Sequence, residues 1–252
     1  MPERFLTNAA RFAAALLTIG LTAATNAEPG LDHRTMAHLD AEPYGMLALD
    51  RLEYGESNDG DTLRWDAEGW YGGDYNKLWL EVDGHGSPGE SPERTELALL
   101  YDRMFSPFWS WRTGLAYDVR GHGQPDIGYL VLGLQGLAPH WFETDAALYL
   151  SEDGDVALRA ELEYDLRLTQ RLVLQPRVEF DLWSDDVPDA GVGRGLSSSE
   201  LGLRLRYEIV RELAPYIGVQ RERRHGDSRD FARAAGEPVS RTSLVIGIRA
   251  WL

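Results

Sequence analysis

The sequence contains no cysteine, which excludes a disulfide framework and any metal site built on thiolates. Basic residues are also few, because 25 Lys and Arg stand against 41 Asp and Glu and give a formal net charge of −16. A protein that binds nucleic acid needs a basic surface to displace counterions from phosphates, so nucleic acid is not an expected partner. The same deficit argues against a polybasic protein of the membrane surface.

Long apolar runs are missing as well. The mean hydropathy is −0.35 and no apolar stretch reaches the ~18 residues of a membrane-spanning helix, so helical spans are excluded. Transmembrane strands remain possible, because each strand hides its apolar half between polar residues.

The N-terminus has the organisation of an export signal. Arg4 and Arg11 precede an apolar segment at 12–24, and small residues follow it up to Ala27. A buried helix would show polar residues at a period of about 3.6, which this segment lacks. We predict a secretory signal peptide over 1–27 and a flexible leader over 28–45.

Beyond the leader, apolar and polar residues alternate in short runs, which predicts strands with one apolar and one polar face. Most runs match the roughly 9–11 residues that a tilted strand needs to cross a bilayer. We predict twelve strands, at residues 46–54, 62–72, 76–83, 95–104, 108–119, 127–137, 140–150, 155–167, 171–182, 199–210, 213–222 and 241–252.

The length of each connection depends on whether it follows an even-numbered or an odd-numbered strand. Those after even-numbered strands are minimal, such as GGDY at 72–75, whereas most of those after odd-numbered strands are longer, such as SDDVPDAGVGRGLS at 184–197. Short turns at one rim, long loops at the other and an even strand number are typical of outer-membrane barrels. We therefore predict an all-β chain whose residues 46–252 form a transmembrane outer-membrane β-barrel of about 12 antiparallel strands.

Tryptophan supports this interpretation, since aromatics that only filled a core would be scattered along the strands. Amphipathic rings prefer the headgroup layer and form a girdle there. Six of the eight tryptophans fall near the short-turn rim, namely Trp70, Trp79, Trp109, Trp111, Trp141 and Trp251.

If the apolar series faces lipid, the polar series fills the lumen with charges of both signs. Two interpretations fit: cross-strand ion pairs that fill a narrow, wet interior, or a polar conduit or cation site that uses the acidic excess. The predicted luminal residues are Asp66, Glu68, Glu81, Arg112, Glu143, Asp145, Arg159, Glu161, Glu163, Arg177, Glu179, Arg204, Arg206, Glu208 and Arg249.

Candidate metal ligands lie first in the leader, where His33, Met36 and His38 are followed by Met46. A flexible segment that combines thioether and imidazole groups suits a soft ion such as Cu(I). The second candidate group is His85, His122 and His225, in or beside predicted long loops. They would form a site for copper, zinc or nickel only if these loops converge, and a lone loop histidine is usually just solvated.

Catalytic arrangements are weak. His225 with Asp227 and Ser228, or Asp83 with His85, are the nearest candidates. Neither set combines a base, an orienting group and a nucleophile in a recognisable pattern, so no enzymatic activity is predicted.

Long phrases of the sequence resemble the copper resistance protein B family of bacterial outer membranes. They are LRWDAEGWYGGDYNKLWLEVDG (63–84), LQGLAPHWFETDAALYLSEDG (134–154), YDLRLTQRLVLQPRVEFDLW (164–183) and LGLRLRYEIVRELAPYIGVQRERRHGDSRDFARAAGE (201–237). The resemblance implies an outer-membrane barrel, without enzymatic activity, that binds copper and contributes to copper tolerance. Its expected partners are copper ions, outer-membrane lipid and a periplasmic copper-handling protein.

The chain departs from the family in its leader. Members typically carry a long segment rich in Met and His, of which His33-x-x-Met36-x-His38 is a remnant. High-capacity sequestration by the leader is therefore in doubt, whereas a site for a few ions or a role of the barrel stays open. The alternative function is a general porin or a structural barrel with incidental metal binding.

Overall fold

The computed structural model describes residues 43–121 and 124–252. The predicted signal peptide, the leader up to residue 42 with His33, Met36 and His38, and the loop residue His122 lie outside these ranges. In the part that is described, no helix is long and apolar enough to cross a membrane.

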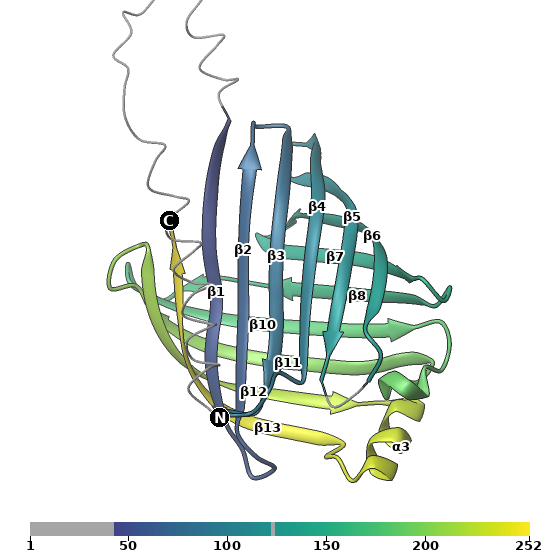
Figure 1. Cartoon of the computed structure of the whole chain (residues 1–252). Helices are drawn as coiled ribbons and strands as arrows, with labels where there is room; N and C mark the ends of the chain where they lie inside the picture. Colours follow the sequence, from purple (N-terminus) through teal and green to yellow (C-terminus); the bar gives the residue numbers. More distant parts are fainter. Residues whose placement is uncertain (1–42, 122–123) are drawn as a thin grey trace, which may run out of the picture. The chain divides into compact units, whose positions relative to one another are not determined.

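The described chain is built almost entirely of long strands joined by turns and loops (Figure 1). The elements are β1 (Tyr44–Glu56), β2 (Thr62–Gly72), β3 (Asn76–Gly86), β4 (Arg94–Ser106), β5 (Trp109–Arg120), β6 (Ile127–Ala138), β7 (Phe142–Ser151), β8 (Val156–Glu163), β9 (Leu166–Arg167), β10 (Leu172–Trp183), the 3-10 helix η1 (Pro188–Ala190), β11 (Gly195–Tyr207), β12 (Leu213–Arg224), α3 (Gly226–Ala235) and β13 (Ser240–Trp251).

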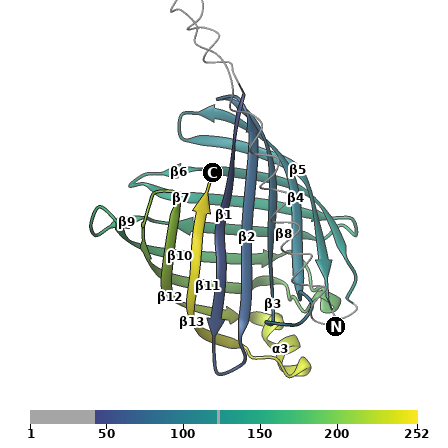
Figure 2. The ribbon, with the colours of Figure 1, turned by 60° about the vertical axis from the view of Figure 1, so that its left-hand side comes forward.

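The sheet closes on itself. Each strand pairs antiparallel with its neighbours in the chain, except that β8 and β9 both pair with β10, and β1 pairs with β13. Two backbone hydrogen bonds continue this seam, from Leu47 N–H to Leu252 O at 3.0 Å and from Leu252 N–H to Leu47 O at 2.8 Å. Figure 2 shows β13 and β1 side by side. The predicted barrel is therefore confirmed, with β8 and β9 together taking the place of one strand.

The break between β8 and β9 departs from the predicted continuous strand 155–167, and Pro176 explains it. Pro176 lies in β10, opposite the break, and its carbonyl accepts a hydrogen bond from Tyr164 N–H at 3.2 Å. A proline has no N–H to return the bond, so the ladder is interrupted at this point.

The predicted parity of the connections is also confirmed. Short turns follow β2, β4, β6, β9 and β11, and the longer loops, with η1 and α3, lie at the opposite rim. In outer-membrane barrels the short turns face the periplasm and the longer loops face the outside. The short-turn rim is therefore the periplasmic rim of this barrel.

Burial is inverted relative to a water-soluble protein. Apolar side chains on the outer face are exposed, for example Leu99 at 51% and Leu201 at 57%. Charged side chains inside are buried, with Asp118 at 0% and Arg204 at 3%. This is the pattern of a barrel with a lipid-facing apolar band and a polar interior.

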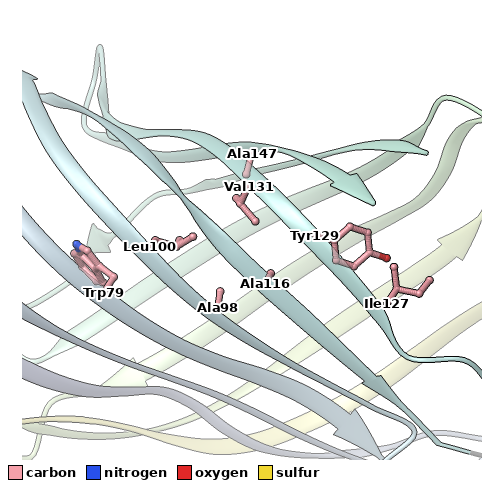
Figure 3. Packing of buried hydrophobic residues seen from close by; sticks show 8 residues of the cluster. All are labelled: Trp79, Ala98, Leu100, Ala116, Ile127, Tyr129, Val131 and Ala147. Atoms are coloured by element: carbon pink, nitrogen blue, oxygen red, sulfur yellow. The ribbon is translucent and has the colours of Figure 1, made fainter. Parts of the chain in front are cut away.

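One sector of the inner wall is apolar, which narrows the lumen without adding charge. It runs along β3 to β7 and consists of Trp79, Ala98, Leu100, Ala116, Ile127, Tyr129, Val131 and Ala147 (Figure 3).

The tryptophans form only part of the predicted girdle. Trp111, Trp141 and Trp251 are exposed near the periplasmic rim, as expected. Trp70 and Trp79 instead pair in register on the luminal face, with ring centroids 6.0 Å apart. They share the strand parity of luminal carboxylates, so their inward orientation follows from the alternation.

Candidate functional site

The lumen contains a cavity of about 640 Å³ that reaches the periplasmic rim, where Phe108 and Leu137 line it. Twelve acidic and eight basic side chains line this cavity, an excess of four negative charges. Every luminal residue predicted from the sequence lines it except Glu208, which lies in the turn after β11 and pairs with Arg167 at 3.9 Å.

A row of carboxylates crosses five strands on the luminal face. Cross-strand partners stand in register along this acidic row, so that each carboxylate has another directly beside it. Like charges placed directly opposite one another are destabilising, so the row requires compensation. The acidic row consists of Asp145 of β7, Glu161 of β8, Glu179 of β10, Glu200 of β11 and Glu222 of β12.

Three arginines compensate the acidic row, each shared between carboxylates. Arg112 bonds Asp145 at 3.0 Å and Glu81 of β3, and its guanidinium lies 4.8 Å from the centre of the Trp79 ring. Arg177 bonds Glu161, Glu179 at 3.2 Å and Glu163 at 3.0 Å. Arg64 bonds Glu200 at 2.8 Å and Glu222 at 3.0 Å.

Several luminal ion pairs join strands that are not neighbours in the sheet, as Arg112 of β5 does with Glu81 of β3 and Asp145 of β7. Arg64 of β2 spans to β11 and β12, and Arg159 of β8 bonds Glu96 of β4 at 3.3 Å. Arg159 and Glu96 line the cavity, whereas Arg94, which also bonds Glu96, does not. The Arg159–Glu96 bridge therefore stands at the inner end of the cavity, between it and the outer mouth.

Four carboxylates that line the cavity have no basic partner within 4.0 Å in the described part of the chain. They are Glu68, Asp83, Asp102 and Glu143. Asp102 accepts a hydrogen bond from Ser110 Oγ at 2.5 Å. Glu68 stands in register with Glu81, and Asp83 with Asp66, so the wall formed by β2 and β3 carries uncompensated negative charge.

The predicted metal ligands are only partly placed. Met46 lies in β1, in register with the luminal Trp70, and the strand begins two residues before the predicted start, at Tyr44. His85 lies in β3, opposite the luminal Arg64. Residues 43–121 and 124–252 contain no group of three or more His, Asp or Glu that could hold a metal ion.

His225 lies directly before α3, at the outer rim. Its Nε2 is 2.8 Å from Ser199 Oγ, whereas Ser228 Oγ lies 2.8 Å from Ser197 Oγ and accepts from Gly193 N–H. His225 and Ser228 thus have separate partners and form no nucleophile–base pair. Their hydrogen bonds fasten α3 to β11.

Some luminal residues escaped the sequence analysis. Asp50 and Arg51 are adjacent in the chain, yet both line the cavity, because a bulge in β1 between Leu49 and Leu52 shifts the register. Strict alternation cannot reveal a bulge. Asp83 lies two residues from Glu81 in β3, and Glu96 lies two residues from Ala98 in β4. Strict alternation therefore places both on the luminal face, so the sequence could have revealed them.

Comparisons with known proteins agree with this architecture. A family model described as copper resistance protein B precursor matches residues 43–252. A copper resistance protein B homolog of Pseudomonas syringae pv. tomato is 40% identical over 212 residues, covering 84% of this chain and 71% of that protein. Copper resistance protein B of Escherichia coli is 39% identical over 206 residues, covering 82% and 69%.

Two solved structures share the fold at low sequence identity. The NanC porin matches with a TM-score of 0.54 and 13% identity, over 81% of this chain and 98% of its own. The KdgM porin matches with a TM-score of 0.50 and 13% identity over the same shares.

Proposed function

The chain belongs to the copper resistance protein B family, and from that premise we propose that it contributes to copper resistance by binding copper ions at the outer membrane or passing them across it. The family and the porin-like fold indicate a protein without enzymatic activity. Copper is the cargo in this proposal, and the lumen is where the barrel would meet it.

The observation that carries the proposal is the acidic cavity at the periplasmic rim. Its excess of four negative charges lies within low-dielectric walls, which focus the field and raise the local concentration of cations. Glu68 and Asp83, which lack a basic partner in the described residues, would receive a cation without first losing an ion pair. Carboxylate oxygens bind divalent transition metals, and His85 adds an imidazole on the same face of β3 as Asp83.

We further propose that the leader delivers the ion. His33, Met36 and His38 precede β1 directly in the chain, and Met46 stands at the periplasmic end of that strand. Their mixed thioether and imidazole groups suit Cu(I). A periplasmic copper-handling protein would meet the same rim.

The deciding experiment is metal analysis of the folded protein in detergent after exposure to copper, beside a variant lacking residues 28–42. This deletion leaves β1 whole, since the strand begins at Tyr44. Equal copper in both proteins would assign the site to the barrel, and loss in the variant would assign it to the leader. If neither protein retains copper, the proposal of copper binding is wrong, and passage of copper or a general porin is favoured.

A smaller change tests the leader in cells. The combined substitution His33→Ala, Met36→Ala and His38→Ala is expected to lower both the copper bound per chain and the copper concentration at which growth stops. A variant with Asp32→Ala and Thr35→Ala, in the same segment, serves as the matched control. If the triple variant binds as much copper and protects as well as the parent, the leader has no part in the function.

The second candidate, a general porin or a structural barrel, is favoured by the ion pairs that fill the lumen and by the porin-like fold. Planar-bilayer recordings separate the two. A conductance that copper neither blocks nor changes would support the porin, whereas a copper-dependent block would support copper in the lumen.

A further inference from the structure

One stretch of the lipid-facing wall carries positive charge. On β12, Gln220 and Glu222 face the lumen, and Glu222 bonds the luminal Arg64. The alternate residues Ile217, Val219, Arg221 and Arg223 face outward and are exposed. The outward series thus changes from apolar to arginine as β12 approaches the outer rim.

Neither guanidinium is neutralised within the described residues. Arg221 and Arg223 have no carboxylate within 4.0 Å, whereas the adjacent Glu222 bonds Arg64 at 3.0 Å and Glu237 bonds Arg224 at 2.6 Å. On the outer part of a membrane-facing wall, an unpaired guanidinium requires an anion or water.

Hydroxyl groups flank the two arginines. Arg221 stands in register with Thr242 of β13, and Arg223 with Ser240 of β13 and Ser199 of β11. Guanidinium groups bind phosphate through paired N–H donors, and serine and threonine hydroxyls add further donors. The chemistry of this surface is that of an anion site whose donors fit phosphate.

We propose that Arg221 and Arg223, with the hydroxyls of Ser240 and Thr242, bind the phosphate groups of a phosphorylated glycolipid in the outer leaflet of the outer membrane. The position decides for lipid over free phosphate, since both arginines continue the lipid-facing series of Ile217 and Val219 at the long-loop end. That end lies at the outer-leaflet headgroups, where arginine gains by meeting anionic lipid.

The test uses the full chain folded in detergent and fluorescently labelled lipopolysaccharide as the probe. The double variant R221Q/R223Q is expected to bind it about 25-fold more weakly, ~5-fold for each guanidinium. The control variant R103Q removes another exposed, outward-facing arginine, on β4 at the opposite rim, and should bind like the parent. Folding is checked by the heat-modifiable migration of the barrel on gels.

Two further measurements identify the chemical group that is bound. Enzymatic removal of the lipid phosphates should weaken binding to the parent about as much as the double substitution does, and millimolar inorganic phosphate should not compete. Equal affinity of parent and double variant, or equal affinity for phosphorylated and dephosphorylated lipid, would overturn the proposal. Competition by inorganic phosphate would overturn the assignment to lipid. If R221Q/R223Q fails to fold, the dephosphorylation arm on the parent decides alone.

Discussion

At the scale of single residues, arginine side chains neutralise the carboxylates that stand side by side in the lumen. Arg177 is 8% exposed and touches three carboxylates on β8 and β10, so it separates groups that would otherwise repel one another. A buried ion pair adds little stability compared with an apolar replacement of both partners. Removing one partner is nonetheless costly, because the other charge is left buried and alone.

The substitution Arg177→Gln is therefore expected to destabilise the barrel by about 3–5 kcal/mol. The measurement is urea unfolding in detergent micelles, followed by tryptophan fluorescence. Arg167→Gln is the control, because Arg167 is exposed and makes a single long contact with Glu208, worth little at a surface. Equal midpoints for Arg177→Gln and the parent would show that Glu161, Glu163 and Glu179 do not depend on Arg177.

At the scale of elements, the sequence predicted the strands and their parity because alternation and loop length are local properties. It missed what depends on a neighbouring strand. Pro176 interrupts the opposite strand at Tyr164, and the bulge in β1 brings Asp50 and Arg51 to the same side. The sequence also predicted that the lumen is charged. It could not predict which carboxylate each arginine bonds, because closure of the barrel brings together strands that are distant in the chain.

The Arg159–Glu96 bridge joins β8 to β4 across the lumen, and we expect it to limit the movement of ions between the cavity and the outer mouth. Arg159→Gln is expected to raise the single-channel conductance in planar bilayers, because no guanidinium of β8 then spans the lumen to Glu96, which keeps only its bond to Arg94. Arg249→Gln is the matched control, since Arg249 pairs at 2.8 Å with Asp50 on the adjacent β1 and bridges nothing. Conductances that rise equally in both variants, or in neither, would contradict a gating role for the bridge.

At the scale of the whole molecule, the cavity contributes an excess of four negative charges to the formal net charge of −16 of the full chain. We expect the barrel to prefer cations in low salt and to lose this preference near 1 M salt, where the Debye length falls to about 3 Å. The sequence anticipated the acidic excess but not which carboxylates remain uncompensated.

The double variant E68Q/E143Q removes two of the four uncompensated charges and is expected to reduce cation preference by about half. The measurement is the reversal potential across a bilayer with a salt gradient. Asp61→Asn is the control, because Asp61 is exposed in the outer turn between β1 and β2. An unchanged reversal potential in E68Q/E143Q would exclude Glu68 and Glu143 as determinants of selectivity.

The sharing of each arginine among several luminal carboxylates also constrains how this lumen can change over evolutionary time. Loss of Arg64, Arg112 or Arg177 leaves at least two acids unbalanced, so a tolerated replacement requires compensating replacements on other strands. Luminal positions on β2, β3, β5, β7, β8 and β10 to β12 should consequently co-vary as groups among related sequences, whereas the lipid-facing positions between them should vary one at a time.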